Sequence, residues 1–441
     1  MKVRSSQLRP RVHQERGSVL IIVLWVAFGL VAITLYFANS MSLELRASDN
    51  RVCALAADQA IEGGVRYASY VLANYGTNGV VPDPTTYSRD AVPVGDARFW
   101  FIGRNPDPQA RPTQPFFALT DENAKLNLNT VSSNVLEMVP NITLDLLSAI
   151  LEWRNTNSSA SLTYAMLHPP YQCKSASFET VDELHLVNGA KMDLLVGEDA
   201  NRNGVLDPNE IDDNRNGTVD PGLLEYFTIW SREPTAGRTN LNNANQLFAL
   251  LQQTLGTARA TAIRSRVSPR PPAPPLNFRS PLQFYLASGM KSDEFALIGT
   301  NVTIATNGYI KGRVNVNTAS PTVLSCLPGM TVDLAQQLVT YRQSNPNNLS
   351  SVAWIVDALG QNNASVLQAL AMTDCITTQS YQFSADVAAL GPYGRGYRRV
   401  RFVIDMSDGT PRIVYRQDLS HLGWALGKDV RDTRFLAKAT R

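Results

Sequence analysis

Residues 19–38 form an uncharged and mostly apolar run, which restricts the possible folds more than any other feature of the chain. A helix of that length rises about 30 Å, which matches the hydrocarbon core of a bilayer. The basic residues ahead of it outnumber the acids, with Lys2, Arg4, Arg9, Arg11 and Arg16 against Glu15. The positive-inside rule then keeps the N-terminus in the cytoplasm. The sequence therefore predicts a single-pass membrane anchor.

The residues just before the apolar run indicate how the anchor is processed. A secretory signal peptide has its small-residue cleavage site after the apolar run. Here the candidate site, between Gly17 and Ser18, lies directly before it. Cleavage there would remove residues 1–17 and leave the apolar helix on the mature protein. This layout is typical of a type IV prepilin-like leader, and an ordinary anchor with an incidental glycine is the alternative.

Length and composition set wider limits. The 441 residues suggest two to four domains at about 150 residues each. A formal net charge of +2 gives no general attraction to nucleic acid or anionic lipid. The four cysteines are scattered without a zinc-site spacing. If the bulk of the chain is exported, Cys326 and Cys375 could form a disulfide, and free buried thiols are an equal alternative. The other two cysteines are Cys53 and Cys173.

The order of the predicted elements points to an α+β fold. No proline occurs between Ser40 and Tyr75, so the anchor is expected to continue as one helix unless it breaks at Gly63–Gly64. Strands are expected at residues 97–102 and 116–119, and a hairpin at 397–406 and 411–415. The chain between residues 131 and 371 is mainly helical. The flanking strands need each other to avoid open edges, which favours an α domain inserted into a small antiparallel sheet.

One short pattern, with asparagine at its second and fourth positions, occurs three times within the helical block. Its copies are residues 126–130, 239–243 and 314–318. Each precedes an apolar helical stretch, and its Asn or Thr could cap that helix. After the third copy the sequence predicts a helix at 321–327, a turn at 328–330 and a helix at 332–342. The first copy predicts the same order, so both are interpreted as helix-hairpin-helix units of SAM-like type.

The sharpest local motif predicts a calcium loop. Residues 199–210 fit the calcium-loop pattern at every required position. Calcium takes six to eight hard oxygens, which alternate residues of a tight loop can supply. The predicted ligands are the side chains of Asp199, Asn201, Asn203, Asp207 and Glu210 and the carbonyl of Val205. A polar turn without metal is the alternative.

A second and weaker copy follows directly. Its predicted ligands are Asp212, Asn214, Asn216, Thr218 and Asp220. Its twelfth position is Leu223, so the bidentate ligand is missing unless Glu225 reaches back. Apolar residues at the outer ends of the loops (Leu194, Leu195, Leu223 and Leu224) predict that metal pins this insertion against the α domain. A structural role for calcium is therefore favoured over a regulatory one.

Catalysis and DNA binding find little support in the sequence. No hydrolase, phosphate-binding or metalloprotease motif occurs, and the four histidines have no metal-ligand spacing. A DNA-binding hairpin combines a glycine turn with nearby cations. Gly329 supplies the turn, but residues 331–337 carry no basic side chain and include Asp333. Protein contacts are the favoured use of these hairpins, and no enzyme activity is predicted.

Several of these features together resemble a known family. The leader and anchor, residues 121–130 and residues 314–330 resemble general secretion pathway protein K, the largest minor pseudopilin of the type II secretion system. The resemblance implies a pseudopilin fold, in which a long N-terminal helix lies on a small antiparallel sheet, with a large inserted α domain of SAM-like, helix-hairpin-helix units.

This resemblance gives a division of the chain. It implies a leader at 1–17, a transmembrane and periplasmic helix at 18–75 and the first part of the β domain at 76–125. A first SAM-like unit at 126–237 would contain the calcium-loop insertion at 199–225. A second unit at 238–376 would include the Pro-rich linker 268–275. The final β part would occupy residues 377–441.

The resemblance also implies processing, location and partners. The chain would be cleaved after Gly17 by prepilin peptidase and methylated at Ser18, and its bulk would lie in the periplasm, anchored in the bacterial inner membrane. Most pilins carry glutamate at the fifth mature position, where this chain has Ile22. A subunit without it need not sit beneath another, which suits the tip of the fibre. Expected partners are the I and J minor pseudopilins and the major pseudopilin fibre.

Two other functions stay open from the sequence. One is a membrane-anchored helix-hairpin-helix DNA-binding protein of the competence type. The other is a calcium-stabilised adhesion module on a pilus tip.

Overall fold

The computed structural model describes residues 18–105, 114–156, 161–267, 277–305 and 308–431. The predicted leader, with Gly17, and the Pro-rich segment 268–275 lie outside these ranges. The α-helices within them are α1 (Ser18–Tyr75), α2 (Pro84–Tyr87), α3 (Ser133–Glu137), α4 (Leu144–Arg154), α5 (Ser161–Ala165), α6 (Met192–Val196), α7 (Leu223–Tyr226), α8 (Ala244–Leu255), α9 (Thr257–Val267), α10 (Pro281–Ser288), α11 (Ser292–Ala296), α12 (Pro321–Ser325), α13 (Val332–Ser344), α14 (Trp354–Leu359) and α15 (Ala364–Thr373).

The strands fall before, within and after the helical block. They are β1 (Val92–Val94), β2 (Ala97–Phe101), β3 (Thr120–Asp121), β4 (Leu126–Asn127), β5 (Phe227–Thr228), β6 (Arg232–Pro234), β7 (Thr239–Asn240), β8 (Val302–Thr303), β9 (Tyr309–Lys311), β10 (Val314–Asn315), β11 (Ile376–Thr377), β12 (Gln382–Leu390), β13 (Arg398–Asp405) and β14 (Arg412–Asp418).

The predicted long helix is confirmed as α1, which runs unbroken for 58 residues. The alternative break at Gly63–Gly64 is wrong, and the structure explains both glycines by close packing. A Cβ at Gly64 would lie 2.6 Å from Val387 Cγ1, and one at Gly63 would lie 3.0 Å from Val94 Cγ2. The helix therefore gives up about 1 kcal/mol of propensity per glycine in order to approach the sheet.

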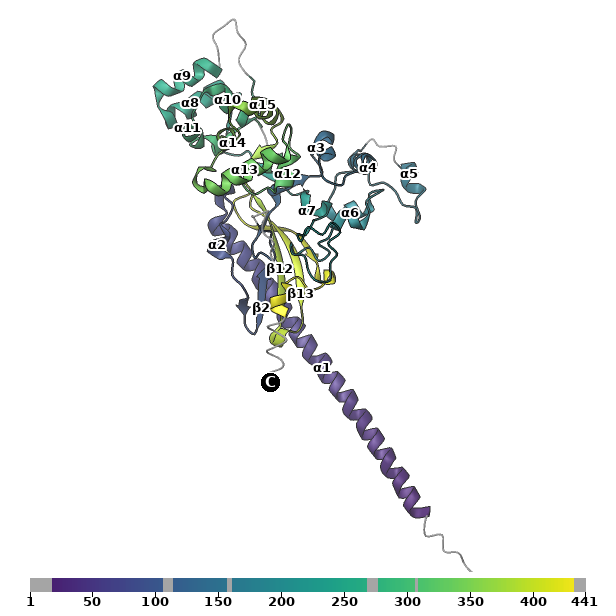
Figure 1. Ribbon diagram of the computed structural model, residues 1–441. Helices are drawn as coiled ribbons and strands as arrows, with labels where there is room; N and C mark the ends of the chain where they lie inside the picture. Colours follow the sequence, from purple (N-terminus) through teal and green to yellow (C-terminus); the bar gives the residue numbers. More distant parts are fainter. Residues whose placement is uncertain (1–17, 106–113, 157–160, 268–276, 306–307, 432–441) are drawn as a thin grey trace, which may run out of the picture.

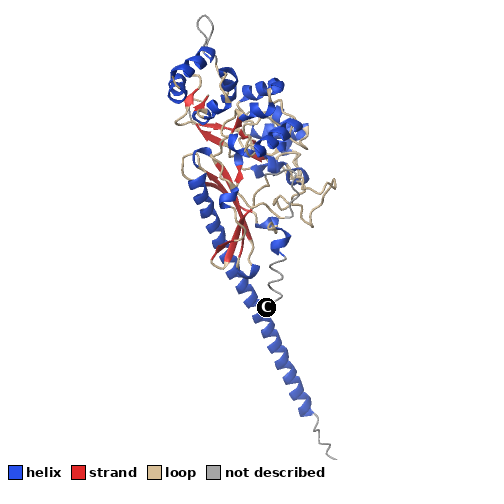
Figure 2. Cartoon of the chain, turned by 60° about the vertical axis from the view of Figure 1, so that its left-hand side comes forward, coloured by secondary structure: helices blue, strands red, loops and turns tan. Residues whose placement is uncertain are grey.

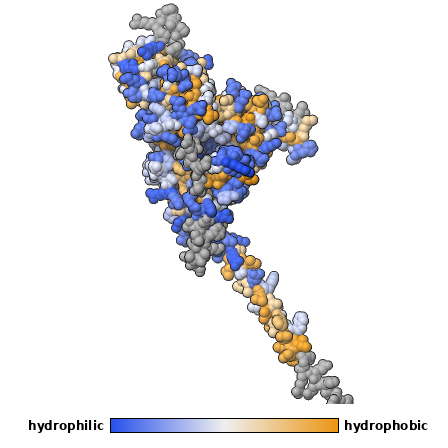
Figure 3. All heavy atoms as spheres, viewed as in Figure 1, coloured by the Kyte–Doolittle hydropathy of each residue, from blue (hydrophilic) through white to orange (hydrophobic). Residues whose placement is uncertain are grey.

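The N-terminal half of α1 extends away from the rest of the molecule. Figure 3 shows it as a rod of mostly hydrophobic residues. Among the described residues, α1 is the helix long and apolar enough to cross a membrane, and none of its most apolar window is buried. The C-terminal half of the same helix contributes Ala57, Ile61, Ala68 and Leu72 to a buried core. One helix therefore joins the predicted membrane anchor to the folded domain.

The sheet beneath α1 is antiparallel and has the order β1-β2-β12-β13-β14, with β3 beside β12. Its central strand, β12, pairs with β2 on one side, where Ala388 faces Trp100, and with β13 on the other. All nine residues of β12 are buried. The face of the sheet toward α1 forms one core, and the opposite face packs Trp100 and Leu390 against Leu426. Because β2 precedes the helical block and β12 follows it, the predicted insertion of an α domain into the sheet is confirmed (Figures 1 and 2).

The insertion contains three units that close in the same way. Each begins with one copy of the asparagine pattern as a two-residue strand, and each ends with a strand that pairs parallel to it. The pairs are β4 with β5, β7 with β8, and β10 with β11. The span 238–376, which the sequence assigned to one unit, holds two of these closures.

The asparagines of the pattern form hydrogen bonds around these strand pairs, and most of them do not cap helices as the sequence suggested. In each copy the first asparagine (Asn127, Asn240 or Asn315) accepts from the backbone N–H two residues on, at 2.8–3.0 Å. The second asparagine reaches a distant loop: Asn129, for example, bonds both the N–H and the C=O of Phe178. Only the second copy also caps its helix, where Asn243 accepts from Gln246 N.

Candidate functional site

The two predicted calcium loops lie between α6 and α7. An isolated β-bridge between Gly197 and Pro221 brings the two ends of the calcium-loop segment together. Leu195 and Leu223, at those ends, are buried in the core of the α insertion. The outer ends of the loops are therefore rooted in the α domain, while the predicted role of metal there stays a prediction.

The side chains of the first loop turn inward and are satisfied by its own backbone. Asp199 accepts from the N–H groups of Asn203 and Gly204, both at 2.8 Å. The amide nitrogens of Asn201 and Asn203 donate to Asp207 Oδ2 at 2.6 and 3.0 Å. Asp199, Asn201 and Asn203 are all buried. Arg202 and Gly204 have positive φ, which gives the loop its sharp turn.

The second loop repeats these contacts at equivalent positions. Asp212 accepts from the N–H groups of Asn216 and Gly217, at 3.1 and 2.9 Å. Asn216 also donates to Asp220 Oδ2 at 3.2 Å, as Asn203 does to Asp207. Arg215 and Gly217 have the positive φ of Arg202 and Gly204. Asn214, Asn216 and Asp220 of the second loop are exposed, however, whereas Asp199, Asn201 and Asn203 of the first are buried.

The twelfth position distinguishes the two loops. In the first, Glu210 folds back and accepts from the N–H groups of Asn201 and Asp207, at 3.3 and 2.9 Å. The idea that Glu225 fills this role in the second loop is wrong, because both its carboxylate oxygens bond Arg104 at 2.8 Å.

Glu198 occupies the corresponding place instead. Its carboxylate accepts from Asp213 N at 2.8 Å and from Asp220 N at 2.9 Å. Asp220 is the ninth residue of the second loop, as Asp207 is of the first, and Glu210 bonds Asp207 N in the same way. Sequence reasoning missed Glu198 because it precedes both loops and lies outside the twelve-residue pattern.

The first loop carries the kinds of oxygen donor that a hard cation prefers. Each asparagine Oδ1 accepts one backbone N–H, which leaves its second lone pair free. Glu210 places a carboxylate where the calcium-loop pattern needs a bidentate ligand. Among the described residues, no group of three or more His, Cys, Asp or Glu side chains could hold a metal ion by itself. The predicted site therefore depends on amide and backbone oxygens as well as on carboxylates.

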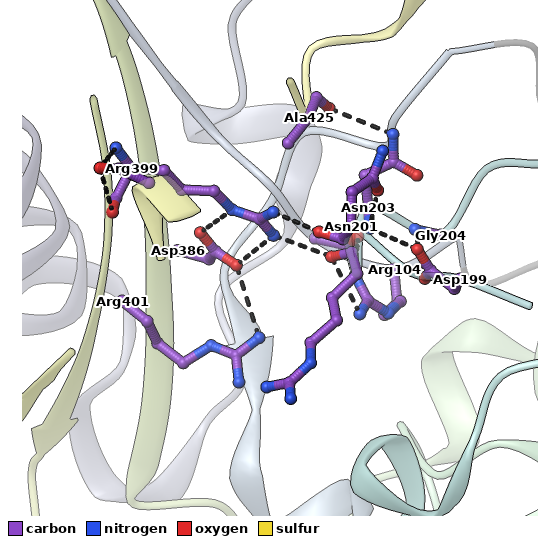
Figure 4. A network of polar contacts seen from close by, with 12 residues as sticks. Arg104, Asp199, Asn201, Asn203, Gly204, Asp386, Arg399, Arg401 and Ala425 are labelled. Carbon is purple, nitrogen blue, oxygen red and sulfur yellow. Dashed lines mark hydrogen bonds and ion pairs between the residues drawn. The ribbon is translucent and has the colours of Figure 1, made fainter. Parts of the chain in front are cut away.

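The tip of the first loop rests on the sheet, a contact that the sequence did not predict. Arg399 of β13 binds both carboxylate oxygens of Asp386 of β12, at 2.9 and 2.8 Å, and donates to the carbonyls of Asn201 and Arg202 (Figure 4). Asn201 also donates to Trp424 O at 3.1 Å. The calcium-loop segment is thus held against the sheet as well as against the α domain, because the buried Arg399 has N–H donors that Asp386 does not use and that bond the loop carbonyls.

Burial and charge shift the pKa values of the acids in this region. Burial by itself would raise the pKa of Asp386, but the positive charges of Arg399 and Arg401 hold it below its ordinary value. Burial raises the pKa of Asp199 and of Glu210, partly opposed by their backbone hydrogen bonds. A bound cation would favour the ionised forms of both.

A second polar junction joins the sheet to two units of the insertion. Asp121 Oδ2 accepts from Asn315, Ser380 and Thr318 at 3.0, 2.6 and 2.5 Å. The adjacent Glu122 accepts from the hydroxyls of Thr228 and Ser384. Burial raises the pKa of Asp121 to about 6, although these hydrogen bonds oppose the shift. The sequence had marked residues 121–130 only by their resemblance to a family.

Both predicted helical hairpins are present, as α3–α4 and α12–α13. The turn between α12 and α13 lies close to another helix of the chain, since a Cβ at Gly329 would be 3.3 Å from Ala369 Cβ of α15. All four cysteines are free among the described residues, so Cys326 and Cys375 do not form the disulfide that the sequence left open.

Comparisons with known proteins give limited matches. Residues 310–353, which include α12 and α13, match the model of a helix-hairpin-helix motif. No curated protein matches the sequence. One similar solved structure is the GspK-GspI-GspJ complex of the type 2 secretion system of enterotoxigenic Escherichia coli. The match has a TM-score of 0.37 and 10% identity, and covers 86% of this chain and 98% of that chain.

Proposed function

We propose that this chain is a minor pseudopilin, which caps the periplasmic pseudopilus of a type II secretion system and helps to initiate it. It would act through subunit assembly and not through catalysis. The observation that carries the proposal is α1, whose apolar residues 19–38 are exposed on every side, while its C-terminal half is buried against the sheet. A subunit that leaves the membrane to join a helical fibre needs this continuous rod.

The position of the insertion supports a place at the tip. The α insertion lies at the end of the sheet away from the free end of α1 (Figure 1), where it would obstruct another subunit above. Ile22 supports the same place, because it offers no carboxylate to pair with a neighbour's buried amine. The proposed partners are the I and J minor pseudopilins and the fibre below, with prepilin peptidase cleaving after Gly17 and Ser18 methylated.

Calcium would stabilise this architecture by holding the first loop in shape against the sheet. Its ligands would be Asp199, Asn201, Asn203, Val205, Asp207 and Glu210. A second ion would take Asp212, Asn214, Asn216, Thr218 and Asp220, with Glu198 in place of the missing twelfth ligand.

Intact-mass analysis of the membrane-extracted chain tests the proposal at its first step. The expected mass lacks residues 1–17 and carries one added methyl group when an active prepilin peptidase is present, and shows the full chain when it is absent. Co-extraction with tagged I and J subunits tests assembly. A chain that begins downstream of residue 38, or that keeps residues 1–17 beside an active peptidase, would contradict the assignment.

The helix-hairpin-helix match keeps one alternative, a membrane-anchored DNA-binding protein. Two observations weigh against it: the Gly329 turn lies against α15, and Asp333 is in the first turn of α13. A mobility shift with duplex DNA decides the matter, because DNA binding through a hairpin must weaken steeply as salt rises.

A further inference from the structure

The second unit of the insertion concentrates positive charge. Residues 234–292 contain no Asp or Glu, whereas the whole chain has a net charge of only +2. The basic residues in that stretch are Arg238, Arg259, Arg264, Arg266, Arg270, Arg279 and Lys291. The stretch forms α8, α9 and α10, which lie at the end of the molecule opposite the free end of α1 (Figures 1 and 2).

Three of these cations gather where α10 ends. Gly289 follows α10 with a φ of 63°. Arg259 Nη2 donates to Gly289 O at 2.9 Å. Arg266 lies across the same glycine, because a Cβ there would be only 1.7 Å from Arg266 Nη1. Lys291, two residues further on, is exposed. We call Arg259, Arg266 and Lys291 the Gly289 cluster.

The Gly289 cluster has more positive charge than its surroundings neutralise. Glu294 binds Arg259 through both carboxylate oxygens at 2.7 Å. Among the described residues, Arg266 forms no salt bridge, and its side chain is exposed. The neighbouring Asp293 is a second acid, which still leaves an excess of cations. Arg266 lies beside Gly289, and its guanidinium can bind a carboxylate through its fork of donors.

We propose that the Gly289 cluster is a docking surface for an acidic segment of a partner protein. Carboxylate is favoured over nucleic acid because the cations of α9 do not form a continuous stripe. Arg264 lies about 140° around the helix from Arg259, and its guanidinium stacks over Phe248 of α8 at 5.0 Å. A nucleic-acid backbone needs cations that follow it, whereas a compact cluster suits one or two carboxylates. Helices α8, α9 and α10 are also remote from the anchor, so they do not face the membrane that the chain would span.

The test uses the full chain in an uncharged detergent and a fluorescein-labelled oligoglutamate, with binding followed by anisotropy at low salt. The double variant Arg266→Gln and Lys291→Gln should weaken binding about tenfold, since each exposed pair contributes up to about 1 kcal/mol. Arg264→Gln is the matched control, because it removes one charge from the same helix on a different face. It should leave binding unchanged.

Gly289→Ala provides a second test that keeps every charge. The new methyl group would meet the Arg266 guanidinium, and it would also strain a residue with a φ of 63°. A variant that melts like the parent protein should still bind oligoglutamate more weakly. The proposal is overturned if oligoglutamate does not bind at low salt, or if Arg264→Gln weakens binding as much as the double variant. It is equally overturned if duplex DNA binds more tightly than oligoglutamate at the same salt. The experiment does not depend on the proposed function.

Discussion

Arg399→Met should release the first calcium loop from the sheet. The change removes the guanidinium that holds Asp386 and bonds the carbonyls of Asn201 and Arg202. Removing one partner of a buried ion pair costs about 3–5 kcal/mol. Arg401 stays 3.4 Å from Asp386, and Arg104 still donates to Arg202 O at 3.3 Å. The cost should therefore lie near the lower limit, about 3 kcal/mol, or a factor of about one hundred in the opening equilibrium.

Hydrogen exchange measured by mass spectrometry follows this local opening of the loop. Peptides covering residues 198–210 should exchange about one hundred times faster in Arg399→Met at constant calcium. Arg398→Met is the matched control, because Arg398 is the adjacent residue of β13 and forms an exposed pair with Asp58 at 3.1 Å and a hydrogen bond to its neighbour Tyr397, but, among the described residues, no hydrogen bond or ion pair with the loop. The double variant Asp386→Leu and Arg399→Met should recover part of the protection, since no buried charge is left alone. Unchanged exchange in Arg399→Met would refute the argument.

Three further outcomes follow from the contacts described above. Gly64→Ala should lower thermal stability by about 1–3 kcal/mol despite alanine's helix propensity, because its Cβ would meet Val387. Gly29→Ala, with open space around it, is the control and should not lower stability. Equal melting curves for the two variants would contradict the close packing of α1 on the sheet. Glu198→Gln should weaken calcium binding at the second loop and Glu210→Gln at the first, each about tenfold or more by calorimetry, and the reverse assignment would exclude Glu198 as a ligand. Burial raises the pKa of Asp121 to about 6, so between about pH 4 and pH 6 the folded state holds a proton that the unfolded state has lost. The free energy of unfolding should therefore fall by roughly 3 kcal/mol as pH rises from about 4 to about 6. Asp121→Asn should flatten that slope in a chemical-denaturation series.

The sequence predicted those parts of the fold that have a strong local pattern. The apolar run and the absence of proline were enough for α1, and turn residues located the β13–β14 hairpin. Strand β12 carried no such signal, since its Ala-rich sequence is buried on both faces and has no alternation. The middle unit was also missed as a separate unit, because its closure pairs β7 with β8 across more than sixty residues.

The candidate site shows the same limit. Ligand identities within a loop follow from spacing, so the first loop could be predicted in detail. Arg399 and Asp386 could not be assigned to it, because Arg399 contacts a segment about 200 residues away in the chain. Glu198 was missed because it lies outside the twelve-residue pattern. Glu225 was considered on proximity in sequence, and the structure gives it to Arg104 instead.

The place of β12 at the centre of the sheet has a consequence for how the protein is made. Trp100 is paired with Ala388, so β2 is synthesised long before its neighbour exists. Closing so long a loop is slow, and β2 would meanwhile present an open edge to other nascent chains. We expect the inserted units, whose closing strands are nearer in sequence, to fold first. Their assembly then brings the two halves of the sheet together, so a lesion in the insertion would delay maturation of the whole subunit.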